Sequence, residues 1–274
     1  MDPQRTKRAP VPRSQRRNDG TPQKPRGPRP GAPREDGPQR IAKLLARAGI
    51  ASRRDIERMI EDGRIAVDGK IIDTPATLLT DLANVTVDGK AVKAPEAARL
   101  FLFYKPPGSL TAARDPKGRP TIYDKLPPGL PRLMPVGRLD YMTEGLLLMT
   151  NDGEFKRQLE LPSTGVVRTY RARAFGEVTQ AQLEALAEGT TIDGMRYGSI
   201  NANLERRTGR NCWIEMSLTE GKKREVRNVL AYLGLQVSRL IRTSYGPFTV
   251  ERMETGDVGE VSRDILFHFR RTLK

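Results

Sequence analysis

In the segment from Gly137 to Gly153, GRLDYMTEGLLLMTNDG, the acidic residue Asp140 follows Arg138 by two positions. A cation near a carboxylate favours its ionised form. The glycines at positions 137 and 145 bracket the acid and permit a sharp backbone turn and close approach by a ligand. An ionised carboxylate in a pocket can act as a nucleophile, a general base or a metal ligand. The structural alternative is an aspartate that only forms a turn or caps a helix.

The composition of the 274-residue chain limits the kinds of site to which Asp140 could belong. One cysteine, Cys212, and one histidine, His268, cannot form a disulfide or a Cys/His metal site within one chain, so we expect no metal and a reducing, cytoplasmic compartment. We interpret Cys212 as a packing residue and His268 as a structural residue. The N-terminal residues contain no apolar h-region, so we expect no secretory signal, and no apolar run is long enough to predict a membrane span.

Positive charge dominates the chain, with a formal net charge of +15 that favours a polyanionic partner, either nucleic acid or an anionic membrane surface. Residues 1–38 hold nine of the 21 prolines, ten of the 48 basic residues and no Leu, Ile or aromatic residue. Such a segment buries too little apolar surface to offset the entropy lost on ordering. We predict a disordered basic arm, which either solubilises the chain or tethers RNA.

Residues 39–93 predict a small module of two helices and two hairpins. The stretch QRIAKLLARAGI has apolar residues at helical spacing, and Gly49 can end that helix. Ser52 is a suitable N-cap for the second helix. The pairs Asp68-Gly69 and Asp88-Gly89 favour tight hairpin turns in two similar stretches of chain.

Basic side chains follow both predicted helices of this module. They are Arg40, Lys43, Arg47, Arg53, Arg54 and Arg58. By composition alone they could form ordinary solvated faces. The stretch AGIASRRDIERMIEDGRIAVDGKII, however, resembles the RNA-binding module named after the fourth small-subunit ribosomal protein, S4. In that family the two helices present basic side chains to structured RNA, so the resemblance implies that these six residues contact phosphates and RNA shape.

After a linker at residues 94–99, residues 100–274 predict a second domain of the α+β class. Strands are predicted from Leu100 to the Pro106-Pro107-Gly108 stop and at 132–136, 145–150, 168–175, 212–219 and 237–244, and helices at 153–161, 179–188 and 223–233. The order does not repeat regular βαβ units, which argues against a Rossmann fold. We therefore expect a mixed, largely antiparallel sheet.

Five ordered blocks of this second domain resemble the bacterial ribosomal RNA pseudouridine synthases, in the group that comprises synthase A for small-subunit RNA and synthases B, E and F for large-subunit RNA. The segment around Asp140 matches the pattern G-R-L-D-x-x-T-x-G-L-L-L-x-T-N-D-G. The other blocks are YKPPG (104–108), RTYRARAFG (168–176), EGKKREVRNVLAYLG (220–234) and SRLIRTSYGPF (238–248). With the RNA-binding module in front, the resemblance spans about 230 residues and is strongest to the type B synthases for large-subunit RNA.

The resemblance implies a role for each matching residue. Asp140 stands at the nucleophile that attacks the uridine, and Tyr170 at the tyrosine that stacks on the base and assists proton transfer. Lys222 stands at the basic residue that forms an ion pair with the aspartate. Arg138, Leu240 and Arg242 are the expected substrate-binding residues. Without the resemblance, Tyr170 and Leu240 would be interpreted as core residues and Lys222 as a solvated strand end.

The implied activity is isomerisation of a specific uridine to pseudouridine in ribosomal RNA, with 23S RNA as the expected target and no cofactor. The uridine must be flipped out of its stack, at about a few kcal/mol, and stacking on an aromatic ring returns about 1–3 kcal/mol. The expected partner is ribosomal RNA or a pre-ribosomal particle, without a membrane, and we expect a monomer. The alternatives are a synthase for small-subunit RNA, a non-catalytic RNA-binding assembly factor, and a metal-dependent nuclease using Asp140 with Glu144 or Asp152.

Overall fold

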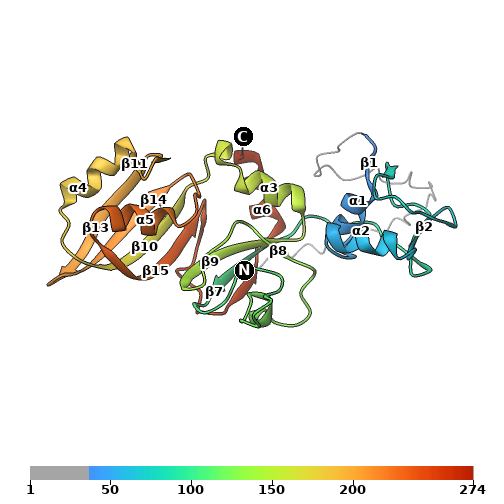
Figure 1. The fold of residues 1–274 in the computed structure, drawn as a ribbon, viewed down its shortest axis with the longest axis horizontal. Helices are drawn as coiled ribbons and strands as arrows, with labels where there is room; N and C mark the ends of the chain where they lie inside the picture. The colour runs from blue at the N-terminus through green and yellow to red at the C-terminus, as the bar shows by residue number, and fades with distance from the viewer. Residues whose placement is uncertain (1–36, 274) are drawn as a thin grey trace, which may run out of the picture. The chain divides into compact units, whose positions relative to one another are not determined.

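The computed structural model describes residues 37–273 (Figure 1). All but the last two residues of the expected basic arm at 1–38 therefore lie outside the described residues. No helix within residues 37–273 is long and apolar enough to cross a membrane.

The N-terminal module has the two helices and two hairpins that its sequence predicts. Its elements are β1 (Gln39–Arg40), α1 (Ile41–Arg47), α2 (Arg53–Glu61), β2 (Ile65–Val67), β3 (Lys70–Ile71), β4 (Leu78–Leu79), β5 (Val85–Val87) and β6 (Lys90–Ala91). Ser52 caps α2 by accepting a hydrogen bond from the backbone N–H of Asp55. Asp68 and Asp88 have φ values of 50° and 51°, each followed by a glycine with positive φ, as a primed hairpin turn requires. The two hairpins pair through β2 and β5 into one antiparallel sheet of four strands.

The second domain is built on a nine-stranded sheet (Figure 1). Its strands are β7 (Leu100–Lys105), β8 (Met134–Pro135), β9 (Thr143–Thr150), β10 (Arg168–Phe175), β13 (Ile200–Thr208), β14 (Asn211–Leu218), β15 (Gln236–Tyr245), β16 (Phe248–Thr249) and β17 (Val258–Glu260). The main order is β13-β14-β10-β15-β9-β7-β17, in which β15 and β9 run parallel and the other neighbours antiparallel. The predicted α+β class with a mixed, largely antiparallel sheet is confirmed.

Helices cover parts of this sheet and complete two apolar cores. They are α3 (Gly153–Glu160), α4 (Gln180–Glu184), α5 (Glu225–Tyr232) and α6 (Arg263–Thr272), with 3₁₀ turns η1 (Tyr123–Lys125), η2 (Pro162–Thr164) and η3 (Ala185–Glu188) and the hairpin β11 (Thr190–Ile192) and β12 (Met195–Tyr197). Residues of α4 and α5 pack with β10, β13 and β14 in one core, and residues of α3 and α6 pack with β7 and β9 in another. Every residue of β9 is buried, which explains the uninterrupted apolar run Leu146 to Met149.

Candidate active site

Asp140 lies in the loop between β8 and β9, at the entrance to the buried strand. Its carbonyl accepts a hydrogen bond from the N–H of Thr143, the first residue of β9, at 3.0 Å. The preceding residue, Leu139, is buried, and its N–H and C=O both pair with the hydroxyl of Thr111, at 3.2 and 2.9 Å. The carboxylate of Asp140 is 36% exposed. The loop therefore holds its backbone firmly while leaving the acid accessible.

The YKPPG block holds the other side of this loop. The ammonium group of Lys105, which is fully buried, donates to the carbonyls of Thr143, Pro106 and Tyr141 at 2.8, 2.9 and 3.3 Å. The N–H of Gly108 also donates to the Tyr141 carbonyl, at 2.8 Å. Burial lowers the pKa of Lys105 to about 8, against the opposing attraction of Asp140 and Glu144. The Lys105 ammonium group thus fixes the backbone that follows Asp140, through its hydrogen bonds to the carbonyls of Tyr141 and Thr143.

Two arginines approach the carboxylate of Asp140. Nη1 of Arg224 lies 3.2 Å from its Oδ2 and donates a hydrogen bond, and Nε of Arg227 lies 3.9 Å from the same oxygen. Burial lowers the pKa of Arg227, whose Nε has no hydrogen-bond partner within residues 37–273. Arg224 has φ +54°, a strained conformation for a residue with a side chain, immediately before α5. The start of α5 thus supplies the positive charge that faces the acid.

Lys222 does not have the contact that the sequence predicted. Its Nζ lies 2.6 Å from Oε2 of Glu220 and donates to the carbonyl of Arg196 at 2.6 Å, beside the β11–β12 hairpin. The predicted ion pair between Lys222 and Asp140 is not found in the described part of the chain. The block GKKREVR does supply the partner of Asp140, but through Arg224 and Arg227, which the sequence pattern did not single out.

The register of the central strands aligns the other predicted site residues. Tyr170 on β10 is opposite Arg242 on β15, and Arg242 is opposite Gly145 on β9. Leu240 is buried and pairs with Thr143, three residues after Asp140. Tyr170, Arg242 and Gly145 therefore form one row across β10, β15 and β9. This row extends from half-buried Tyr170 to the strand that follows the Asp140 loop.

Arg242 is buried in this row. Its Nε donates to the carbonyl of Leu146 at 2.7 Å, and its Nη2 lacks a hydrogen-bond partner within the described chain. Arg138 is exposed, and its role stays a prediction.

The acids required by the nuclease alternative have other partners. Glu144 is buried and pairs with Arg239 at 2.6 and 3.1 Å. Asp152 caps α3 by accepting from the N–H groups of Glu154 and Phe155. Within residues 37–273, no three His, Cys, Asp or Glu residues are grouped to hold a metal ion. Of the remaining candidates, Cys212 is buried in the core, as expected for a packing residue, and His268 is exposed on α6.

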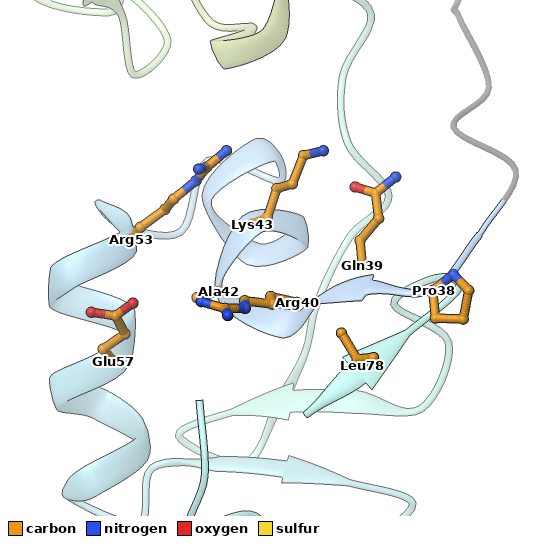
Figure 2. Close-up of a pocket in the computed structure, with 8 residues that line it drawn as sticks. All are labelled: Pro38, Gln39, Arg40, Ala42, Lys43, Arg53, Glu57 and Leu78. Carbon is orange, nitrogen blue, oxygen red and sulfur yellow. The ribbon is translucent and has the colours of Figure 1, made fainter. Parts of the chain in front are cut away.

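The basic residues of the N-terminal module lie on or next to its helices. Arg40, Arg53, Arg54 and Arg58 are exposed and Lys43 and Arg47 are half-buried. Arg40 belongs to β1 and precedes α1, so it is not in a helix as predicted. A hollow lies between the start of α1 and α2, and Figure 2 shows Arg53, Lys43 and Gln39 pointing to the same side of it. Arg58 pairs with Asp55 on its own helix.

Comparison with known proteins gives a consistent match over both domains. Residues 99–232 match the family model for RNA pseudouridylate synthase, and residues 39–81 match the S4 domain. An uncharacterized RNA pseudouridine synthase of Rickettsia conorii is 40% identical over 227 residues, covering 83% of this chain and 98% of that protein. Ribosomal large subunit pseudouridine synthase B of Escherichia coli O6:H1 is 42% identical over 215 residues, covering 76% and 74%.

A solved structure described as a pseudouridylate synthase shares the fold. Its TM-score is 0.58 at 24% identity, with 83% of this chain and 97% of that chain covered. The chain belongs to the RNA pseudouridine synthase family, whose members are isomerases that act on RNA, and it carries an S4 domain in front of the synthase domain.

Proposed function

We propose that this protein converts a specific uridine of large-subunit ribosomal RNA to pseudouridine, with Asp140 as the nucleophile. The observation that carries this proposal is the accessible carboxylate of Asp140, 3.2 Å from Arg224 and 3.9 Å from Nε of Arg227, at the end of a rigidly held loop. The 42% identity to a large-subunit synthase supports the choice of target. The S4 domain and the net charge of +15 support an RNA substrate.

In the proposed reaction, the Asp140 carboxylate bonds to C1′ of the flipped uridine and the C1′–N1 bond breaks, leaving its electron pair on uracil. The base rotates and C5 bonds to C1′ as the aspartate leaves. The proton on C5 is then lost and N1 gains a proton, so the product is an isomer of the substrate. Tyr170 stacks on the base and assists this proton transfer.

Arg224 and Arg227 each have an electrostatic role in the proposed reaction. The guanidinium groups of Arg224 and Arg227 orient the Asp140 carboxylate before attack and stabilise the negative charge on the departing uracil. The unpartnered Nε of Arg227 can complete its hydrogen bond to Asp140 with a small movement, since the two atoms are 3.9 Å apart. Lys222, which pairs with Glu220, is left outside the reacting groups.

The test is release of tritium from ribosomal RNA transcripts labelled at C5 of uridine, assayed in EDTA. Wild type is expected to release tritium from a large-subunit transcript, and Asp140→Asn to lose at least a thousandfold in rate. Asp193→Asn is the matched control, because Asp193 lies in the turn between β11 and β12 and has no ion pair or hydrogen bond to Asp140, Arg224 or Arg227 within residues 37–273. Arg227→Ala is expected to lose activity and Lys222→Ala to keep most of it.

Other outcomes would change the proposal. Substantial release by Asp140→Asn would remove the nucleophile assignment. Release from the small-subunit transcript only would change the target. Tight RNA binding without release from either transcript or from pre-ribosomal particles would favour the assembly-factor alternative.

A further inference from the structure

One half of the large sheet has two very different faces. The strands β13, β14, β10 and β15 lie side by side in that order (Figure 1). On one face Ala172, Ile214 and Leu240 are buried in the core that α4 and α5 complete. The alternate residues of the same strands are mostly exposed or half-buried. Here this second surface is called the open face.

A row of three arginines and a tryptophan crosses the open face. In the strand register, Arg206 on β13 is opposite Trp213 on β14, Trp213 is opposite Arg173 on β10, and Arg173 is opposite Arg239 on β15. Like charges directly opposite each other destabilise a sheet. Arg173 and Arg239 occupy such a position, so the row is poorly explained by folding stability alone.

Only part of this positive charge is neutralised. Arg239 pairs with Glu144, and Arg171, also on the open face, pairs with Glu205 at 2.7 Å. The side chains of Arg173 and Arg206 are exposed and have neither an ion pair nor a hydrogen bond to another residue within 37–273. The open face also carries Glu215, in register with Arg171. Arg173 and Arg206 thus remain available to bind an anion.

Aromatic rings on the open face are paired with guanidinium groups. The guanidinium carbon of Arg171 lies 5.0 Å from the Trp213 ring centre, and that of Arg210 lies 4.7 Å from the Phe175 ring centre. Phe175 is 41% exposed. Flat guanidinium and aromatic surfaces beside free cations are the features on which bases of single-stranded nucleic acid stack while phosphates are neutralised.

We propose that the open face binds a single-stranded RNA segment, with phosphates on Arg173 and Arg206 and bases stacked at Trp213 and Phe175. The side chains of Arg171 and Arg173 alternate along β10 with Tyr170 and Ala172, so they project from the opposite side of the sheet to Tyr170. This RNA segment is therefore different from the one whose uridine reaches Asp140. The proposal rests on the proposed function only for the choice of RNA as the polyanion.

The experiment uses the intrinsic fluorescence of Trp213, the only tryptophan in the chain. The full-length protein is titrated with poly(U) at several salt concentrations, and the midpoint of the fluorescence change is measured. Wild type is expected to respond saturably. Arg173→Ala/Arg206→Ala is expected to raise the midpoint at least fivefold and to lower the salt slope by about 1.4, the value for two lost phosphate contacts on a single strand.

A control with the same loss of charge is Arg252→Ala/Arg263→Ala, since both residues are exposed and lie outside these four strands. It should keep the wild-type midpoint and slope. Poly-glutamate is the competing probe, and a response to it without one to poly(U) would overturn the proposal in favour of an acidic protein partner. A poly(U) midpoint unchanged in Arg173→Ala/Arg206→Ala would also overturn it.

The two proposals fail in distinguishable ways. Asp140→Asn should lose tritium release and keep the Trp213 response, because Asp140 is not on the open face. A wild-type protein that shows the response but releases no tritium would leave RNA binding by this face intact while the proposed catalysis fails. Tritium release by a protein without a Trp213 response would overturn RNA binding by the open face and leave the proposed catalysis intact.

Discussion

Gly145 on β9 lies directly opposite Arg242 on the parallel strand β15. It has φ +102°, and a Cβ atom at this position would lie 2.3 Å from the carbonyl oxygen and 2.8 Å from the nitrogen of Arg242 on the parallel strand β15. Replacing Gly145 by alanine forces these backbones apart. Backbone strain at positive φ contributes about 1–2 kcal/mol and overpacking about 1–3 kcal/mol, so we expect a loss of about 2–5 kcal/mol in unfolding free energy.

The measurement is urea unfolding of Gly145→Ala, followed by Trp213 fluorescence because Trp213 lies in the same sheet. The matched control is Gly129→Ala: Gly129 has φ +85°, but a Cβ there meets no atom within 4 Å. The control isolates backbone strain and should lose about 1–2 kcal/mol. Equal losses for the two variants would refute the reasoning, because the close approach to Arg242 would then contribute nothing.

Three further predictions concern buried groups of the same domain. Arg168→Met should lose about 3–5 kcal/mol of unfolding free energy in urea, because buried Arg168 donates to the carbonyls of Leu159, Val166 and Thr219 and to the hydroxyl of Tyr245, and a buried acceptor left without its donor costs about 1–3 kcal/mol. A loss under 1 kcal/mol would contradict this. Burial lowers the pKa of Lys105 from 10.5 to about 8, so between these pH values the unfolded state binds more protons than the folded state. The unfolding free energy of wild type, relative to that of Lys105→Met, should therefore increase as the pH rises through this range. A constant difference between the two proteins from pH 7.5 to 10 would show that the pKa is not lowered. Cys212 is 1% exposed and burial raises the pKa of its thiol, so a thiol reagent should react with it in denaturant and not with the native protein; rapid native reaction would show that the core opens.

Local patterns were sufficient to predict much of the framework. The two Asp-Gly pairs form the predicted hairpins because each turn needs consecutive residues with positive φ, which is a property of the pair itself. The predicted strand at 168–175 has the observed bounds of β10. The strand Ile200–Thr208 was not predicted, although Ile200, Ala202 and Leu204 alternate in its first half. The charged residues Glu205 to Arg207 hide that alternation, because they lie at a bulge on the edge of the sheet.

The partner of Asp140 could not be chosen from local sequence. Lys222, Lys223, Arg224 and Arg227 offer four cations within six residues of one block. Which of them faces the acid depends on the positive φ of Arg224 and on the start of α5 at Glu225, which together direct Arg224 and Arg227 towards Asp140. Lys222 is held instead by Glu220, two residues away. The choice is set by backbone geometry and contacts between distant elements, and neither follows from residue type.

The spacing of the motif around Asp140 has a structural meaning that extends beyond the acid. Thr143 closes the turn that begins at Asp140, and two residues later Gly145 allows β15 to approach as a parallel neighbour. That approach places Arg242 next to β9, where its guanidinium group donates to the carbonyl of Leu146. The interval from acid to glycine therefore fixes where Leu240 and Arg242, about a hundred residues later, stand relative to the Asp140 loop. An insertion between Asp140 and Gly145 would move the acid along this register without changing any residue of the candidate site, so the spacing itself is part of the geometry of that site.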